Sequence, residues 1–286
     1  MENDSADILA VIRAALREDI GTGDVTSERV FSTDARITGV FIAKAAGVLA
    51  GLDVAEMVFA ELDSSCTFQA RLKNGDSVEP GSVLAEISGP AQAILKGERT
   101  ALNFLQRMSG IATETKKYVD AVRDTSCRIL DTRKTAPGLR VLDKQAVRSG
   151  GGLNHRQGLF DMVLIKDNHI DAAGSITKAV ESVRSGHQPN LPIEVECRTL
   201  EDVKEAIGLG VDRIMLDNMD IDTIRGAVAL ADKGIPLEVS GNVSLRNVRS
   251  YAETGVQFVS VGALTHSVSA LDITLRIAPG TENRPS

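Results

Sequence analysis

The sequence has no tryptophan and few aromatic residues of any kind, which narrows the classes of protein it can belong to. Phe, Trp and Tyr together make up 3% of its 286 residues, and the formal net charge is −7. Single-stranded nucleic acids are bound by aromatic side chains in a positively charged groove, and duplexes are bound by basic surfaces. We therefore expect no nucleic-acid partner for this acidic chain.

Cysteine and long apolar runs are also scarce. Cys66, Cys127 and Cys197 are odd in number and far apart, which is typical of free thiols in a reducing compartment. No apolar run approaches the roughly 20 residues that span a membrane. The first residues, MENDSADIL, are acidic, whereas a targeting signal is basic and then apolar. These features predict a soluble, cytoplasmic protein without a membrane partner.

Residues 1–110 alternate between helical and strand-like patterns, and we expect them to form an α+β domain with an antiparallel sheet. Helices are predicted over 6–18, 52–62 and 97–122, the last with a candidate break at Ser109-Gly110, and strands over 37–44, 66–72 and 82–89. Residues 74–89 also have the rhythm of a biotinyl or lipoyl carrier domain. Such a domain needs a lysine at a hairpin tip, which is missing here, so a structural sheet is the better interpretation.

From Cys127 onward, short apolar runs ending in polar residues alternate with helical stretches. The last four runs have regular spacing: Glu196, Asp217, Ser240 and Gly262 follow one another at intervals of 21, 23 and 22 residues. Repeated βα units of this size build a parallel sheet. About six strands predict an open, incomplete β/α barrel over residues 111–269, with a doubly wound sheet as the alternative. The tail 270–286 is expected to pack on the first domain. The six runs are CRILDTRK, DMVLIKD, LPIEVEC, DRIMLDN, PLEVSGN and QFVSVGA.

Positive charge is concentrated in residues 133–166, where seven Lys or Arg residues and two acids give a formal charge of +5. A basic segment in an acidic protein attracts anions. Arg and Lys beside His155 and three consecutive glycines suit carboxylate or phosphate groups better than metals. The alternative is a solvated charged helix face. The seven residues are Arg133, Lys134, Arg140, Lys144, Arg148, Arg156 and Lys166.

Polar residues stand at or just after the carboxyl end of each predicted barrel strand, and this face carries the active site in β/α barrels. A single strand-end acid often only caps the next helix, but six such positions together favour a functional site. They are Lys134, Lys166, Glu196, Asp217, Ser240 and Gly262.

The chemistry of these groups suggests two neighbouring subsites. Glu196 and Asp217 are hard oxygen ligands suited to Mg²⁺ that bridges to a phosphate-rich substrate. The loops 240–242 and 262–267 offer backbone N–H groups before helix starts, as phosphate sites do. We expect a carboxylated second substrate at the cationic residues Arg133, Lys134, His155, Arg156 and Lys166.

Motifs along nearly the whole chain resemble the quinolinate phosphoribosyltransferase family, the decarboxylating enzymes of NAD biosynthesis. The most specific is NHR-x-GL-x-D followed by LIKDNH, within residues 154–169. The other motifs are EDIGTGDVTSE, GERTALNFLQRMSGIAT, DTRKTAPGLR, AVRSGGG, IEVE, IMLDN, EVSGN and VGALTHS.

The resemblance implies an amino-terminal α/β sandwich, an open β/α barrel and a homodimer or larger assembly whose partner subunit completes each site. It implies that quinolinate and phosphoribosyl pyrophosphate are the substrates, that Mg²⁺ is held by Glu196 and Asp217, and that Lys134 and Lys166 join these two acids as catalytic residues. Arg99 would enter the partner's site, although its sequence context alone favours an ordinary surface charge. The full set of expected substrate-binding residues is Arg99, Arg133, Lys134, His155, Arg156, Lys166, Glu196, Asp217, Ser240, Gly241, Asn242, Gly262, Ala263 and His266.

Two functions of other classes stay open on the sequence. A lysine at a barrel strand end, Lys134 or Lys166, could form a Schiff base in a lyase. The chain could also be a non-catalytic binding protein for phosphorylated metabolites. Borohydride trapping with carbonyl substrates would reveal the lyase, and an assay with quinolinate would separate the enzyme from the binding protein.

Overall fold

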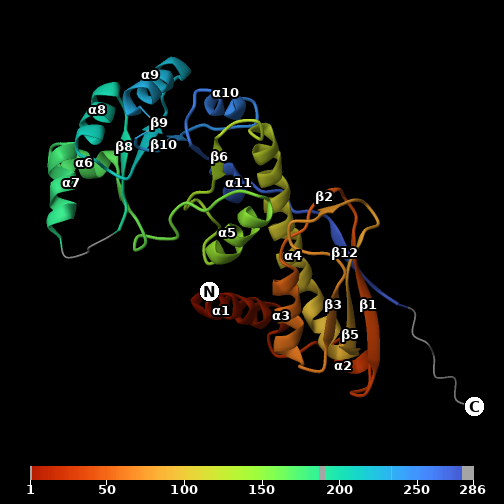
Figure 1. The fold of residues 1–286 in the computed structure, drawn as a ribbon. Helices are drawn as coiled ribbons and strands as arrows, with labels where there is room; N and C mark the ends of the chain where they lie inside the picture. The colour runs from red at the N-terminus through yellow and green to blue at the C-terminus, as the bar shows by residue number, and fades with distance from the viewer. Residues whose placement is uncertain (1, 187–190, 233, 279–286) are drawn as a thin grey trace, which may run out of the picture. The chain divides into compact units, whose positions relative to one another are not determined.

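The computed structural model describes residues 2–186, 191–232 and 234–278, which form two compact units (Figure 1). Unit 1 contains the residues up to Glu114, Ala136–Gly151 and the residues from Ser267 onward, and unit 2 contains Thr115–Thr135 and Gly152–His266.

Unit 1 is built on a four-stranded sheet with the order β12-β1-β5-β3, in which neighbouring strands are antiparallel. Buried and more exposed positions alternate along the second half of β1. Its buried Phe41 packs against Phe59 and Phe68, with ring centroids 6.1 and 5.8 Å away. The elements are α1 (Glu2–Ile20), α2 (Ser27–Val30), β1 (Arg36–Ala43), β2 (Gly47–Val48), α3 (Leu52–Leu62), β3 (Thr67–Ala70), β4 (Ser77–Val78), β5 (Val83–Pro90), the first part of α4 (Ala91–Ala121), α5 (Arg140–Ser149) and β12 (Ile273–Ile277).

These elements confirm the predicted α+β character of the first part of the chain. The helix predicted over 52–62 is α3, and the strands predicted over 37–44, 66–72 and 82–89 are β1, β3 and β5. Within the tail 270–286, β12 pairs with β1, whereas residues 279–286 lie outside the described residues.

The break predicted at Ser109-Gly110 is wrong, because α4 continues from Ala91 to Ala121. Both residues serve close packing. The buried Ser109 hydroxyl accepts a hydrogen bond from Ala50 N at 3.0 Å and donates one to Ala50 O at 3.1 Å. A Cβ on Gly110 would lie 2.2 Å from the backbone oxygen of Ser269. The domain boundary expected between residues 110 and 111 falls inside this helix and stays a prediction.

Unit 2 is a six-stranded parallel sheet with the order β6-β11-β10-β9-β8-β7. Each of the six apolar runs forms one strand, which confirms the predicted open β/α barrel. From β7 to β11 every strand is added on the same side of the previous one, so the order never reverses as in a doubly wound sheet. The elements are β6 (Arg128–Leu130), β7 (Val163–Ile165), α6 (Asp167–Ala173), α7 (Ile176–Ser185), β8 (Ile193–Cys197), α8 (Leu200–Gly208), β9 (Arg213–Asp217), α9 (Ile221–Ala231), β10 (Leu237–Ser240), α10 (Val248–Ala252), β11 (Phe258–Ser260) and α11 (Ala263–His266).

Residues 153–162, which we call the edge loop, are the last part of the connection from β6 to β7, the two edge strands of this sheet. Leu153 forms a bridge with Leu130 of β6, and β7 begins directly after the loop. The buried carboxylate of Asp131 accepts hydrogen bonds from Asn154 Nδ2 and from the backbone N–H of His155. The loop is therefore fixed at the end of β6 by a side chain that follows that strand.

Among the described residues, no helix is both long and apolar enough to cross a lipid bilayer.

The tight packing at Gly110 predicts how unit 1 responds to an added methyl group. Gly110→Ala should lower the free energy of unfolding by about 1–3 kcal/mol, because the methyl group meets backbone that must move. The matched control is Gly208→Ala in α8, where nothing lies within 4 Å of the new Cβ. That change should raise stability by about 0.4–1 kcal/mol. Urea unfolding of both variants checks this, and a Gly110→Ala protein as stable as the parent would contradict the packing described here.

Candidate active site

A cavity of about 490 Å³ opens at the carboxyl ends of the strands of unit 2. It gathers many of the expected site residues from positions far apart in the sequence. Those that line it are Arg133, Lys134, His155, Arg156, Lys166, Glu196, Asp217, Ser240, Gly241 and Asn242.

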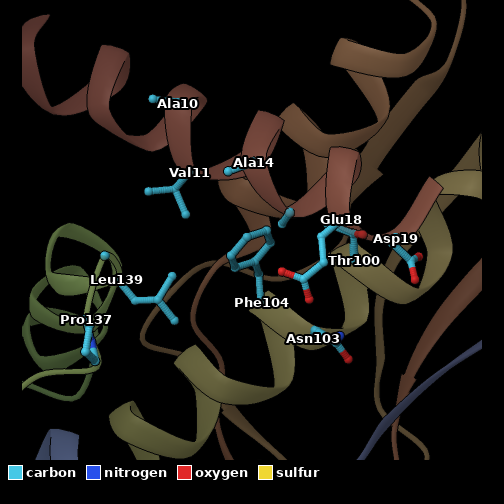
Figure 2. Close-up of a pocket in the computed structure, with 12 residues that line it drawn as sticks. Ala10, Val11, Ala14, Glu18, Asp19, Thr100, Asn103, Phe104, Pro137 and Leu139 are labelled. Atoms are coloured by element: carbon cyan, nitrogen blue, oxygen red, sulfur yellow. The ribbon is translucent and has the colours of Figure 1, made fainter. Parts of the chain in front are cut away.

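A second cavity, of about 550 Å³, lies in unit 1 (Figure 2). Alanine methyl groups, Val11 and Phe104 make up much of its lining, and the acids Glu18 and Asp19 stand on α1 at one part of it. We place the candidate site in unit 2 because only that cavity, of these two, combines cations and acids.

Basic side chains from three segments line one part of the cavity. Arg133 and Lys134 follow β6, His155 and Arg156 belong to the edge loop, and Lys166 follows β7. The Arg156 side chain is nearly buried, and its Nη1 donates to Met162 O at 3.4 Å. Burial, with a smaller effect from Arg133, lowers the pKa of Arg156. Cations gathered in a partly desolvated space are well suited to a substrate with several carboxylates.

Local contacts hold the two lysines of the cavity. The backbone O of Lys134 accepts a hydrogen bond from Thr265 Oγ1 at 2.9 Å. A Cβ on Gly262 would lie 3.1 Å from Lys134 Cδ and 3.2 Å from the ring of His266, so glycine leaves room there. The backbone N–H of Lys166 donates to His169 Nδ1 at 2.9 Å, which accounts for the histidine in the LIKDNH motif.

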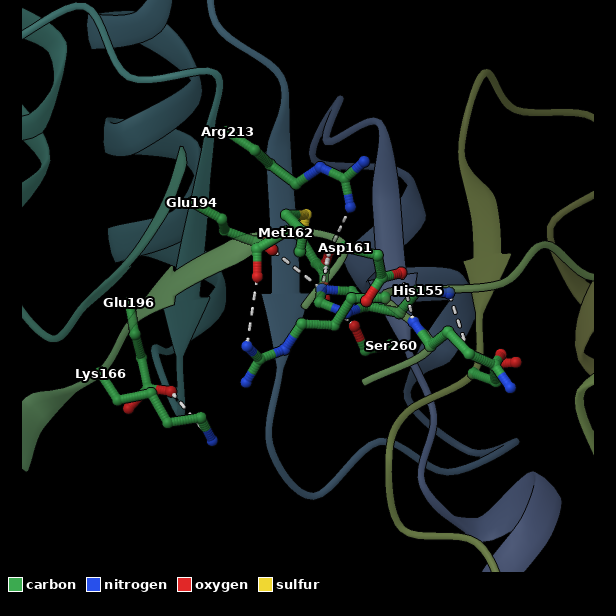
Figure 3. Close-up of polar contacts among 12 residues, drawn as sticks. His155, Asp161, Met162, Lys166, Glu194, Glu196, Arg213 and Ser260 are labelled. Carbon is green, nitrogen blue, oxygen red and sulfur yellow. Dashed lines mark hydrogen bonds and ion pairs between the residues drawn. The ribbon is translucent and has the colours of Figure 1, made fainter. Parts of the chain in front are cut away.

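Two acids, Glu196 at β8 and Asp217 at β9, also line the cavity. Lys166 Nζ lies 3.8 Å from Glu196 Oε2 (Figure 3). Burial raises the pKa of Glu196, Lys166 lowers it, and the charges of Asp217 and Asp167 raise it again. A carboxylate near other carboxylates is stabilised by a bound cation, as expected for a metal ligand.

The loop after β10 is shaped by its neighbour after β9. A Cβ on Gly241 would lie 2.2 Å from Asn218 Oδ1, and Gly241 has φ +103°. Asn218 Nδ2 donates to Asp217 Oδ2 at 2.9 Å, and Asn242 Nδ2 donates to Asn218 Oδ1 at 3.1 Å. The Ser240-Gly241-Asn242 turn is thereby tied to the acid of the adjacent strand.

Four of the expected residues do not line this cavity. Gly262 is not part of the lining but lies next to Lys134, which is. Ala263 and His266 belong to the short helix α11. Arg99 is an exposed side chain of α4 in unit 1.

The basic segment 133–166 is divided between the units. Arg140, Lys144 and Arg148 lie on α5 in unit 1, where Lys144 is fully buried, and the glycines that follow end this helix. Of the seven basic residues counted in this segment, these three therefore do not line the cavity.

Sequence reasoning missed several side chains that line the cavity or lie beneath it. Glu194 and Glu238 precede the rim residues Glu196 and Ser240 by two positions, and Arg213 precedes Asp217 by four. Because side chains alternate along a strand, this spacing places them on the same face of the sheet as the rim, and it could have revealed them. The lining residues that were missed are Thr132, Leu164, Asp167, Met215, Asn218, Glu238 and Ser260.

Glu194 and Glu238 are fully buried acids. Burial, followed by the charge of Glu194, raises the pKa of Glu238 to about 7, against the opposing effects of His155, Ser260 and Arg213. Burial also raises the pKa of Glu194. Two acids in a low-dielectric interior need such partners to stay there.

Comparison with known proteins identifies the two parts of the chain. Residues 24–109 match the family model described as the N-terminal domain of quinolinate phosphoribosyl transferase, and residues 111–276 match the model of its C-terminal domain.

Whole proteins with the same layout are similar along nearly their full length. The chain is 49% identical to nicotinate-nucleotide pyrophosphorylase [carboxylating], chloroplastic, of Arabidopsis thaliana, over 95% of this chain and 83% of that one. It is 45% identical to the probable nicotinate-nucleotide pyrophosphorylase [carboxylating] of Bacillus subtilis, over 93% and 92%. The structure of nicotinate-nucleotide pyrophosphorylase from Francisella tularensis superposes with a TM-score of 0.91 at 40% identity, covering 96% of each chain. With both domains, their order and the fold in agreement, this chain belongs to the quinolinate phosphoribosyltransferase family.

Proposed function

We propose that the protein transfers the phosphoribosyl group of phosphoribosyl pyrophosphate to quinolinate and decarboxylates the product. The products are nicotinate mononucleotide, pyrophosphate and CO₂, in de novo NAD biosynthesis. Family membership and one observation support this proposal. The cations Arg133, Lys134, Arg156 and Lys166 line the same cavity as an acid pair and a glycine turn. Transfer of a sugar is thus favoured over Schiff-base chemistry at a single lysine.

The two substrates use different parts of the cavity. Quinolinate carries two carboxylates and fits beside Arg133, His155 and Arg156, where desolvated guanidinium groups bind carboxylates strongly. Phosphoribosyl pyrophosphate fits beside Glu196, Asp217 and the 240–242 turn, with Lys134 and Lys166 between the two subsites. The turn offers backbone N–H groups and the lysines offer charge to its phosphates.

The acid pair fits Mg²⁺, which binds through one or two carboxylates together with substrate phosphates. Glu196 and Asp217 would hold the ion, and the pKa of Glu196, which is raised by burial and by the charges of Asp217 and Asp167, supports this proposal. Bound there, Mg²⁺ would neutralise charge on the pyrophosphate leaving group.

The reaction then depends mainly on positioning and charge. The pyridine nitrogen of quinolinate is already a nucleophile, so its lone pair forms the new bond to ribose C1 while the C1–oxygen bond to pyrophosphate breaks. The C2–carboxylate bond next breaks, CO₂ leaves, and the electron pair stays at C2 beside the positively charged ring nitrogen. A proton then adds to C2. Lys134 and Lys166 are the ammonium groups of the cavity lining that can supply it.

We further propose that the enzyme is a homodimer in which Arg99 of each subunit completes the partner's site. Its exposed position on α4, outside the unit that holds the cavity, leaves it available for that role. A cytoplasmic location is also proposed, supported by three cysteines that are all free thiols.

The first test concerns substrate choice. With phosphoribosyl pyrophosphate and Mg²⁺, quinolinate should yield nicotinate mononucleotide, whereas nicotinate, with one carboxylate, should react with a kcat/KM lower by about 10- to 100-fold. Cations left without a carboxylate partner cost about 1–3 kcal/mol. Steady-state assays with both acids measure the ratio, and equal values would refute the two-carboxylate subsite.

The second test separates the subsites. Asp217→Asn should raise the KM for phosphoribosyl pyrophosphate and the Mg²⁺ concentration needed, because one oxygen ligand loses its charge. Calorimetry should show quinolinate binding little changed. Asp222→Asn is the matched control, since Asp222 lies exposed on α9 in an ion pair with Arg225. An equal loss of quinolinate binding in Asp217→Asn would show that the roles are assigned wrongly.

The third test asks whether Arg99 serves the partner's site. Arg99→Ala and Lys134→Ala homodimers should each be nearly inactive. In their heterodimer one site carries both defects and the other carries neither. With random pairing half the dimers are mixed, so about a quarter of the parent activity should return.

The same mixture also has a clear negative outcome. If Arg99 served its own chain, every site of the heterodimer would hold one defect. Purified mixed dimers without recovered activity would then exclude the shared site.

A further inference from the structure

The edge loop is held by two buried acids of the barrel, one of which, Glu238, also lines the cavity. Glu194 on β8 and Glu238 on β10 are both 0% exposed. They stand two residues before Glu196 and Ser240, so their side chains lie on the same face of the sheet, one layer below the rim. Neither is accounted for by the proposed reaction, although buried carboxylates are costly unless they are well paired.

Both acids lie close to one nitrogen of His155, and Figure 3 labels Glu194 and His155 of this group. Glu194 Oε2 lies 2.9 Å from His155 Nε2, and Glu238 Oε2 lies 3.5 Å from the same atom. An ionised carboxylate only accepts hydrogen bonds, so with Glu194 ionised the proton of this contact lies on Nε2. The ring is 6% exposed but still lines the cavity. One edge of the ring thus contacts acids from two strands, while the residue also lines the cavity.

Further polar side chains interact with these two acids. Arg213 Nη1 donates to Glu238 Oε2 at 3.0 Å, and Ser260 Oγ donates to Glu238 Oε1. Glu194 Oε1 is buried without a hydrogen-bond partner, and the charge of Arg156 acts on this carboxylate. Arg156 follows His155 in the edge loop, so Glu194 interacts with both of these neighbouring side chains and Glu238 interacts with His155.

A metal ion is the alternative occupant of this cluster. The ligand atoms of His155, Glu194 and Glu238 lie within 4.8 Å of one another, as a metal site requires. However, Arg213 already occupies Glu238 Oε2 and forms a cation–π contact with Phe258, 4.5 Å from the ring centroid. A second cation is disfavoured next to this guanidinium.

We propose that Glu194 and Glu238 are positioning residues for the quinolinate subsite, which hold the His155 ring and the edge loop in the geometry that receives a carboxylate. They act through His155 and Arg156, the neighbouring side chains with which they interact. The inference rests on the proposed function, since it assigns quinolinate to that subsite. It predicts that loss of either negative charge weakens quinolinate binding much more than binding of phosphoribosyl pyrophosphate.

Isosteric substitutions test the proposal by removing charge while keeping volume. Glu194→Gln and Glu238→Gln should each raise the KM for quinolinate by about 10- to 100-fold, as expected for hydrogen bonds between charged groups. The KM for phosphoribosyl pyrophosphate should change less than threefold. Glu86→Gln is the matched control, because Glu86 pairs with Arg71 on the sheet of unit 1. An unchanged KM for quinolinate in both barrel variants would overturn the proposal.

A double variant separates positioning from simple charge balance. If Glu238 only compensates Arg213, Glu238→Gln combined with Arg213→Gln should restore the quinolinate KM. Under the positioning proposal the KM stays raised, because the contact with His155 is still lost.

Proton NMR of the unmodified protein covers the case in which the variants do not fold. A slowly exchanging His155 Nε2–H resonance, assigned by its loss in His155→Gln, supports the proposal even if quinolinate is not the substrate. Its absence overturns the proposal, and so does a stoichiometric transition metal in the purified protein. Failure of the parent enzyme to use quinolinate would instead refute the proposed function.

Discussion

Parallel pairing of the six strands of unit 2 is the constraint on which the candidate site depends. Because every strand runs in the same direction, side chains separated by 21 to 23 residues in the sequence meet at one edge of the sheet. The same register also builds a deeper layer, since residues two positions earlier point to the same side. The alternation of side chains along a strand therefore accounts for both layers. It places Glu196 and Ser240 at the rim and the buried acids Glu194 and Glu238 one layer further inside.

The site separates charge within a small volume of a protein that is acidic as a whole. Basic side chains from the β6 end, the edge loop and the β7 end share the cavity with two rim acids, and a second pair of acids is fully buried beside them. At low dielectric these charges interact more strongly than they would in water. The cations can then select for substrate charge because their positions are set before the substrate arrives, which reduces the free-energy cost of organising the site.

Much of this arrangement could be predicted from the sequence, and the predictions that were wrong or incomplete have identifiable physical reasons. The apolar runs and their polar ends located the six strands and most of the rim, because burial and strand direction are local properties. The charge count over 133–166 failed for Arg140, Lys144 and Arg148, since α5 belongs to the other unit. Ser109-Gly110 resembles a helix break because glycine has a low helix propensity. The contacts to Ala50 and Ser269 that favour these small residues involve distant parts of the sequence and are not visible in a local pattern. Glu194 and Glu238 were readable from strand alternation but were overlooked between more prominent motifs.

The way the edge loop is held couples ligand affinity to local folding. Its amides bond to carboxylates: His155 N donates to Asp131, and Gln157 N and Gly158 N donate to Asp161. Leu159 and Phe160 are each 73% exposed, so little apolar burial stabilises the tip. Segments of this kind open with a smaller free energy than the strands around them. The measured affinity for a carboxylated substrate is then the intrinsic affinity multiplied by the fraction of molecules in which this loop is closed.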